Sequence, residues 1–204
     1  LAHARLLERL APAMREAGRL IEQMKANGFE RRDKPDKSIV TEVDEASERL
    51  LEAAIRELDP DAIIIGEEAS AAGIRPDHGA RFWLIDPLDG TNGFVRGRSD
   101  YSVNVGLVED GVPTLGLILH PPKQTLWTGA IGLGAWRDGP DGQRHAIRTR
   151  PLATPAAIAT SHSHLDRHTQ AWVDAVPGAI ISPSSSSLKF CLLAEGQQDA
   201  YPRY

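Results

Sequence analysis

The sequence has a single cysteine and no long apolar run. Because Cys191 is the only cysteine, it has no partner for a disulfide. It lies between Phe190 and Leu192, so we expect it in the core. No apolar stretch approaches the length that spans a bilayer, and no secretory pattern opens the chain. These absences favour a reducing location, the cytoplasm, with peripheral association with the inner membrane as a further option.

Positive charge is also scarce. The 204 residues hold 23 Lys and Arg against 28 Asp and Glu, a net charge of −5, with no basic stripe. Nucleic acid is therefore not an expected partner. A nucleotide-sized substrate stays open, because a few local cations and a metal can hold it. The length allows one large domain or two small ones, and composition leaves both a monomer and a homodimer open.

Hydrophobic spacing predicts two helices near the N-terminus. Apolar residues recur at helical spacing up to Met24, and Gly28 is placed to end that helix. Pro12 is an awkward interior residue there, so it either kinks the helix or marks the first turn of a shorter one. A charged loop at 30–38 precedes a second predicted helix at 42–58.

Strands dominate the middle of the chain, and strands and helices alternate at its end. After a short buried strand at 62–65, alternating residues predict antiparallel strands at 101–108, 114–120, 125–130 and 135–137, then a polar turn at 138–145. Beyond Pro151 the pattern predicts strand 157–160, helix 166–176, strand 179–182, helix 186–195 and strand 199–201. We therefore expect an N-terminal α+β domain over 1–150 and the start of a C-terminal α/β domain over 151–204.

Residues 83–94 read Trp-Leu-Ile-Asp-Pro-Leu-Asp-Gly-Thr-Asn-Gly-Phe and carry the most specific signal. An apolar strand ends on Asp86, and a second carboxylate, Asp89, follows. Carboxylates and a carbonyl are hard oxygen ligands that suit Mg²⁺ or Mn²⁺. Gly90 and Thr91 come next and can offer backbone N–H groups to an anion. A metal site beside a phosphate cradle is typical of a phosphate-ester hydrolase.

Glu67 and Glu68 end the preceding short strand. Charged residues at a strand end are commonly just a solvated edge. If the two strands lie side by side, however, Glu67, Asp86 and Asp89 meet at one edge of a sheet. Such a cluster repels itself unless cations occupy it.

Asp44 lies at the start of the second predicted helix and has two possible roles. With Thr41 as N-cap, it is placed to complete a variant of the capping box. Alternatively, Asp44 and Thr91 together orient and deprotonate a metal-bound water. The two roles are compatible, and nothing local decides between them.

Two later segments are candidate substrate contacts. Ser161-His-Ser-His164 lies between a strand and a helix, as either an ordinary surface loop or a loop that contacts adenine or phosphate. The run Ser184-Ser-Ser-Ser-Leu-Lys189 provides either simple helix capping or a second anion site.

With these motifs the chain resembles the inositol monophosphatase superfamily of metal-dependent, lithium-sensitive phosphatases. The matching segments are Val40-Thr-Glu-Val-Asp44, Gly66-Glu-Glu68 and Trp83-Leu-Ile-Asp-Pro-Leu-Asp-Gly-Thr91. The later segments resemble the 3′(2′),5′-bisphosphate nucleotidases of the CysQ type, whereas Asn92-Gly93 departs from the Lys-Glu pair frequent in that subfamily. The resemblance implies a layered α/β sandwich of the inositol monophosphatase and fructose-1,6-bisphosphatase type.

The resemblance also implies a site with two or three Mg²⁺ ions. One ion would bind Glu67, Asp86 and the Leu88 carbonyl, and a second would share Asp86 and add Asp89. A third, weaker ion near Glu67 would carry the attacking water. The catalytic residues would be Asp44, Thr91 and Glu67, and the amides of Gly90 and Thr91 would hold the phosphate. The implied substrate contacts are Ser161, His164, Ser186, Lys189 and Arg203.

The implied activity is removal of the 3′-phosphate from 3′-phosphoadenosine 5′-phosphate, a step associated with sulfur assimilation. An inositol-1-phosphate or sugar monophosphatase, and an inactive nucleotide- or metal-binding pseudo-phosphatase, are the alternatives. In the family a Trp-Asp motif follows the Tyr-Pro-Arg segment and supplies a further ligand of the second metal. The sequence stops at Tyr204, before any such motif, so we expect a longer gene product.

Overall fold

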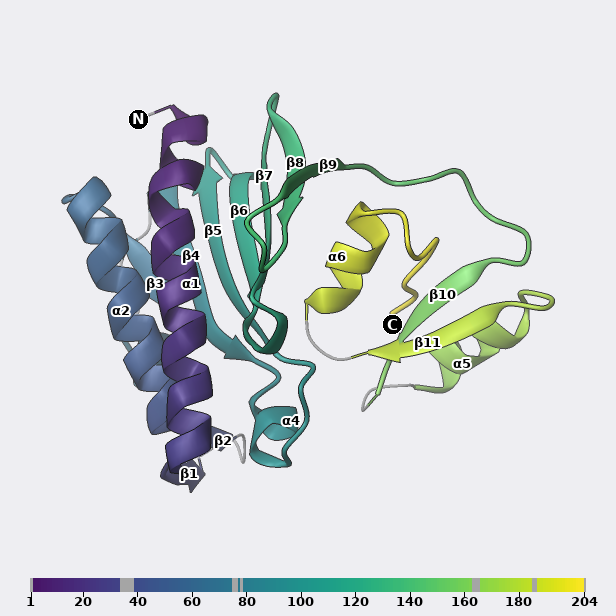
Figure 1. Cartoon of the computed structure of the whole chain (residues 1–204), viewed down its shortest axis with the longest axis horizontal. Helices are drawn as coiled ribbons and strands as arrows, with labels where there is room; N and C mark the ends of the chain where they lie inside the picture. Colours follow the sequence, from purple (N-terminus) through teal and green to yellow (C-terminus); the bar gives the residue numbers. More distant parts are fainter. Residues whose placement is uncertain are drawn as a thin grey trace.

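The computed structural model describes residues 2–33, 39–74, 77, 79–162, 166–184 and 187–203. Its elements lie in layers (Figure 1). The helix pair α1 (His3–Asn27) and α2 (Glu42–Leu58) covers one face of a large sheet, and the C-terminal elements lie on the other side. This arrangement is the layered α/β sandwich that the sequence predicts.

Helices α1 and α2 begin and end close to where the sequence predicts. Helix α1 runs without interruption through Pro12, and Gly28 follows it with φ +84°, a conformation that glycine adopts without strain. Helix α2 starts with the capping box: the backbone N–H of Thr41 donates to Asp44 at 2.8 Å, and the Thr41 side chain accepts from the backbone of Asp44. The capping role expected for Asp44 is confirmed.

The large sheet has seven strands in the order β3-β4-β5-β6-β7-β8-β9. Strands β3 and β4 pair in parallel, and all other neighbours are antiparallel. The antiparallel strands follow one another along the chain, so short turns join most of them. The strand bounds are Ile64–Gly66, Arg81–Asp89, Ser102–Glu109, Val112–His120, Thr125–Ala130, Gly134–Asp138 and Arg144–Ile147.

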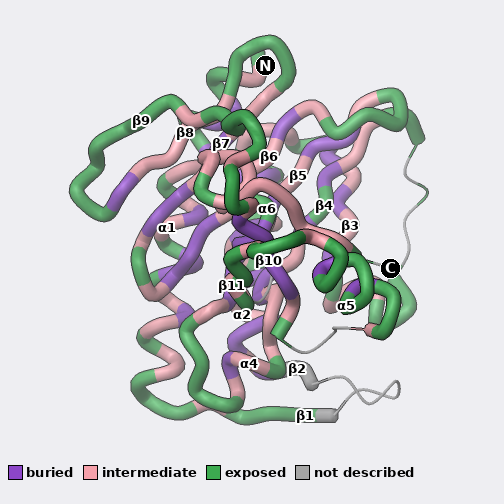
Figure 2. Tube along the Cα trace, turned by 90° about the vertical axis from the view of Figure 1, so that its right-hand side faces the viewer, coloured by how far each residue is buried: buried purple, intermediate pink, exposed green. Residues whose placement is uncertain are grey.

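The main core lies between this sheet and the two helices. Met14, Ile21 and Leu51 from the helices meet Trp83 and Leu107 from the sheet, and all five side chains are almost fully buried. Figure 2 shows buried segments along both helices and the central strands, whereas helix α5 (Arg167–Asp174) is largely exposed. Burial therefore concentrates in the part of the chain that ends with the large sheet.

The C-terminal elements form a second, smaller layer system. Strands β10 (Ala157–Ser161) and β11 (Ile180–Ser184) pair in parallel, with α5 connecting them. Helix α6 (Leu188–Ala194) lies between this pair and the large sheet (Figure 1), and Cys191 is buried there, as expected. Strand β9 ends at Ile147 and β10 begins in another sheet. The division at residue 150 itself stays a prediction.

Three local predictions need correction. Part of the predicted loop at 30–38 is strand β1 (Arg31–Asp33), which pairs with β2 (Ile39–Thr41). The predicted turn at 138–145 overlaps strand β9, which pairs with β8. The predicted strand at 199–201 reduces to one bridge between Ile158 and Ala200. Short pairings depend on the partner strand, which the periodicity of a single segment does not report.

Among the described residues, no helix combines the length and the apolar character needed to cross a membrane.

The close approach of α1 to the sheet generates a stability prediction. A Cβ atom at Gly18 would lie 2.4 Å from Cδ2 of Leu119, a fully buried side chain. Ala normally stabilises a helix by about 1 kcal/mol relative to Gly. Here we expect Gly18→Ala to lower the free energy of unfolding by about 1–3 kcal/mol through overpacking. In a Leu119→Ala background the same change should cost much less, because only the side-chain amide of Gln124, 2.9 Å from the added Cβ, then has to move. Urea denaturation measures both, and a stabilised single variant would contradict the prediction.

Candidate active site

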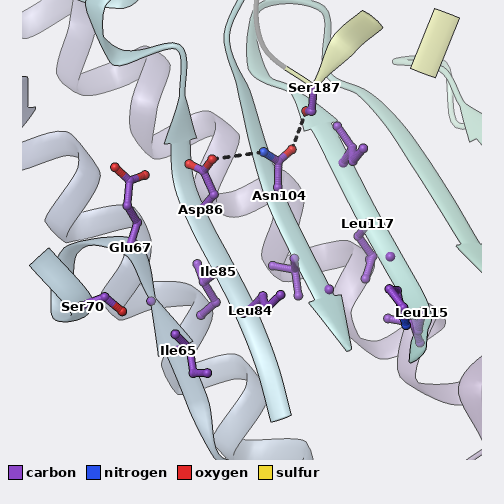
Figure 3. Close-up of a pocket in the computed structure, with 16 residues that line it drawn as sticks. Ile65, Glu67, Ser70, Leu84, Ile85, Asp86, Asn104, Leu115, Leu117 and Ser187 are labelled. Atoms are coloured by element: carbon purple, nitrogen blue, oxygen red, sulfur yellow. Dashed lines mark hydrogen bonds between the residues drawn. The ribbon is translucent and has the colours of Figure 1, made fainter. Parts of the chain in front are cut away.

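The parallel pairing of β3 and β4 brings the predicted carboxylates to one edge of the sheet. Gly66 lies opposite Ile85, so Glu67 and Asp86 follow at the same level of the two strands. Both side chains project at this edge (Figure 3). The expectation that the two strands lie side by side is confirmed.

A β-bulge brings Asp89 to the same face as Asp86. In a regular strand, residues three apart point to opposite faces. Here Asp86 pairs with Asn104 and Asp89 with Ser102, so β4 has one residue more than β5 over this stretch. Pro87 lies within the bulge and cannot donate to the ladder. The extra residue restores the alternation, and both carboxylates share one face.

The Asp86 carboxylate is the most perturbed group of the site. Its Oδ1 atom is buried and accepts no hydrogen bond from the described residues. Burial, together with the negative charges of Asp89 and Glu67, raises the pKa of Asp86 to about 8. An unpaired buried carboxylate oxygen among like charges is poorly stabilised without a cation.

Asp44 and Thr91 are in direct contact, although 47 residues separate them. The Thr91 hydroxyl lies 3.1 Å from Oδ1 of Asp44 and 2.8 Å from the Leu88 carbonyl oxygen, and it donates to these two acceptors. Asp44 is almost fully buried, and burial raises its pKa against the hydrogen bonds from Thr41 and Thr91. Asp44 therefore combines helix capping with a contact to the candidate site.

The turn after β4 leads directly into a short helix. Gly90 has φ +100°, in the left-handed region, and directly precedes the five-residue helix α4 (Thr91–Val95). The first N–H groups of a helix have no partner within it and point away from its start. The predicted phosphate-binding residues, Gly90 and Thr91, thus begin this helix beside Asp89.

Helix α6 contacts the same edge through Ser187. Its backbone N–H donates to Asp89 at 2.6 Å, and its hydroxyl donates to Oδ1 of Asn104 at 2.7 Å. The Ser187 and Ser102 hydroxyls are 2.8 Å apart, and the amide of Asn104 lies 3.5 Å from Asp86. Figure 3 shows the line from Asp86 through Asn104 to Ser187. Ser187 belongs to the run 184–189 that the sequence marks as helix capping or an anion site, and it directly precedes α6. Asn104 was missed, and the alternation of Ser102 and Asn104 on this face of the sheet is the signal that could have found it.

Helix α2 supplies two further polar residues that the sequence analysis missed. The Ser47 hydroxyl donates to the Pro87 carbonyl at 3.0 Å. The buried Glu48 carboxylate accepts from the backbone N–H groups of Glu68 and Ala69 at 2.9 and 3.0 Å. Both residues lie one turn after Asp44, on the buried face of the helix.

The predicted substrate residues are only partly assembled. Lys189 is buried, and burial lowers the pKa of its ammonium group. The charge of Arg203 adds to this shift, and the charge of Asp89 opposes it. Its ammonium group donates to the Ser184 carbonyl at 3.3 Å and lies 5.1 Å from the centre of the Tyr201 ring. Arg203 is exposed, with its guanidinium 3.4 Å from the Tyr201 hydroxyl, and Ser161 ends strand β10. His164 and Ser186 lie outside the described residues.

The donor set suits a hard divalent cation. Over the described ranges, no three His, Cys, Asp or Glu side chains converge closely enough to hold an ion by themselves. Among the described residues the resemblance assigns two carboxylates to each main ion, with Leu88 adding a carbonyl to one of them, and the further ligand of the second ion belongs to the Trp-Asp motif of the family. The unpaired Oδ1 of Asp86 and the purely oxygen donors fit Mg²⁺ or Mn²⁺.

A cavity of about 580 Å³ lies on the sheet face opposite α1 and α2. Glu67, Asp86 and Ser187 lie at its polar end, and apolar residues of β3 to β6 line the rest (Figure 3). Gly106 and Gly116 face each other in register and leave this part of the sheet without side chains. The carboxylates are therefore accessible from a hollow and not sealed in the core.

This fold and these clustered carboxylates define a hydrolase of the phosphatase type. The model of the inositol monophosphatase family matches residues 4–204. The 3′(2′),5′-bisphosphate nucleotidase CysQ of Salmonella typhimurium is 35% identical over 98% of this chain and 80% of its own. The chain belongs to the inositol monophosphatase family.

Solved structures agree with this placement. Mycobacterium tuberculosis SuhB superposes with a TM-score of 0.75 and 30% identity, over 98% of this chain and 77% of its own. CysQ from Bacteroides thetaiotaomicron superposes with a TM-score of 0.76 and 24% identity, over 100% of this chain and 80% of its own. The predicted family and fold class are confirmed.

The raised pKa of Asp86 predicts how metal-free stability depends on pH. The unfolded chain releases this proton near pH 3.8, whereas the native state holds it up to about pH 8. Between these values the native state binds more protons, so its stability falls as the pH rises, by at most about 1.4 kcal/mol per pH unit. Asp86→Asn should remove this contribution.

Urea denaturation in EDTA at pH 5 and pH 8 measures the effect. We expect the wild type to lose more stability than Asp86→Asn when the pH rises from 5 to 8. An equal difference between the two proteins at both pH values would contradict the prediction.

Proposed function

We propose that this protein is a Mg²⁺-dependent phosphatase that removes the 3′-phosphate of 3′-phosphoadenosine 5′-phosphate, giving AMP and phosphate. The observation that carries the proposal is the shared face of Asp86 and Asp89, next to the contact between Thr91 and Asp44. It combines the hard ligands and the phosphate cradle of residues 86–91 with a proton acceptor that α2 brings to them. The similarity to 3′(2′),5′-bisphosphate nucleotidases of the CysQ type supports the choice of substrate.

Glu67, Asp86, Asp89 and the Leu88 carbonyl would hold the cations, two or three in number. When bound, Mg²⁺ lowers the pKa of water and neutralises charge on the phosphate and on the leaving oxygen. The native pKa of Asp86 would fall in that state, because a nearby cation favours the ionised carboxylate.

Asp44 and Thr91 form a route for the proton of the attacking water. In the proposed step the water oxygen bonds to phosphorus as the bond from phosphorus to the 3′ oxygen breaks. Water gives a proton to the Thr91 hydroxyl, which passes its own proton to Oδ1 of Asp44 across 3.1 Å. The raised pKa of Asp44 makes it a better proton acceptor than an ordinary carboxylate. The amides of Gly90 and Thr91 would orient the phosphate.

The second phosphate would bind on the side of α6. Lys189 and Arg203 both lie at Tyr201, the ammonium group 5.1 Å from the centre of its ring and the guanidinium 3.4 Å from its hydroxyl. Two cations beside an acidic metal site favour a substrate that carries two separate phosphates. Ser161, His164 and Ser186 are the remaining proposed contacts.

Phosphate release across substrates tests the activity. With Mg²⁺ we expect faster release from 3′-phosphoadenosine 5′-phosphate than from inositol 1-phosphate. EDTA and Asp89→Asn should each abolish release, because EDTA removes the cations and Asp89→Asn removes a ligand of the second one. Preference for inositol 1-phosphate would favour an inositol monophosphatase. Mg²⁺ binding without turnover, in the full-length gene product as well, would favour a pseudo-phosphatase.

The role of Lys189 has its own test. We expect Lys189→Met to raise KM for the bisphosphate nucleotide about 10-fold or more, because a hydrogen bond to a charged group is lost. The apolar stem of Met keeps the packing of the buried side chain. Phosphate release from the nucleoside 3′-monophosphate, which lacks the second phosphate, should change little. The exposed Lys123→Met is the matched control, and an equal loss on both substrates would contradict a role at the second phosphate.

A further inference from the structure

Glu48 is a buried carboxylate for which the proposed reaction has no use. It lies on the second turn of α2, and its side chain points at the start of the short helix α3 (Glu67–Ala71). Each carboxylate oxygen accepts one backbone N–H, Oε2 from Glu68 at 2.9 Å and Oε1 from Ala69 at 3.0 Å. Two such bonds from a buried anion are strong and directional.

The contact fixes the conformation of the turn that carries Glu67. Glu67 is the first residue of α3, and the bonded N–H groups belong to the next two residues. A helix of five residues is too short to be stable by itself, so its first turn needs an external partner. The position of this turn therefore sets where the Glu67 side chain begins.

Gly66 shows how closely Glu48 approaches this turn. A Cβ atom at Gly66 would lie 2.4 Å from the Cδ atom of Glu48, closer than Cβ atoms approach other heavy atoms. Gly66 has a φ of −89°, which any residue can adopt. The glycine is therefore required by the space that Glu48 occupies and not by backbone conformation.

We propose that Glu48 is a positioning residue that holds the first turn of α3 so that Glu67 faces the cation shared with Asp86. The inference rests on the proposed function, because it takes Glu67 as a metal ligand. Residues that orient metal ligands typically contribute 10–100-fold to metal affinity. Glu48 acts on the backbone of the ligand segment and touches neither metal nor substrate.

Direct metal binding tests this role. Mn²⁺ titration of the metal-free protein, followed by electron paramagnetic resonance, gives the affinity without turnover. We expect Glu48→Gln to weaken Mn²⁺ binding about 10–100-fold, because an amide group cannot accept at both positions. Glu52→Gln, one turn further along α2, is the matched control and should bind as the wild type does. With the bisphosphate nucleotide as substrate, Glu48→Gln should have a lower kcat than the wild type and nearly the same KM.

Amide hydrogen exchange of the metal-free protein separates positioning from general destabilisation. In Glu48→Gln, the N–H groups of Glu68 and Ala69 should exchange faster than in the wild type, while the core strand around Leu107 stays protected. Unchanged exchange at both residues would overturn the inference. Loss of protection at Leu107 as well would also overturn it, since Glu48 would then support the whole fold.

A double-mutant cycle with Gly66 provides a second route. Gly66→Ala should weaken Mn²⁺ binding as Glu48→Gln does, because the new Cβ displaces the carboxylate. In a Glu48→Ala background the same change should add little, since the clash is gone. Additive losses would overturn the proposed contact.

Glu67→Gln separates this inference from the proposed function. If Glu67→Gln weakens Mn²⁺ binding and Glu48→Gln does not, the positioning role fails alone. If Glu67→Gln leaves Mn²⁺ binding unchanged, the metal site of the proposed function fails, and the role of Glu48 fails with it.

Discussion

The bulge in β4 is the constraint on which the site depends. In a regular strand without the bulge, Asp89 would point to the helix-covered face of the sheet, where burying a charge is costly. With the bulge, Asp86 and Asp89 share the face that α6 approaches, and the chain leaves the strand at Gly90. The same residue that interrupts the ladder, Pro87, offers its carbonyl to Ser47 of α2. An irregular strand is therefore supported by a regular helix.

Helix α2 connects three segments of the site through one buried face. Asp44 contacts Thr91, Ser47 contacts Pro87, and Glu48 holds the start of α3. Residues three and four apart lie on the same face of a helix, so a single rigid element sets the relative positions of these segments. Stability and chemistry share these side chains. A polar face of this kind costs desolvation, and each group offsets that cost with hydrogen bonds.

The sequence predicts the fold best where its signals are local. The bounds of α2 agree with the prediction, because Thr41 and Asp44 form a cap and Leu51 and Ile55 repeat at helical spacing. Strand β9 was missed, since most of it is exposed and only its pairing with β8 makes it a strand. The predicted strand at 199–201 is the opposite case, because it pairs with β10 through one bridge only and the pattern of a single segment does not report its partner.

The residues of the site also differ in how far the sequence predicts them. The contact between Asp44 and Thr91 follows from motifs with a known order, whereas Glu48 belongs to no such motif. Its signal was nevertheless present: Glu48 lies on the stripe that contains Asp44, Leu51 and Ile55, where a solvated glutamate is not expected. A charged residue on an apolar stripe must find a buried partner or lose its charge. In this chain the partner is the backbone that presents a metal ligand, so the anomaly in the hydrophobic pattern leads to the site itself.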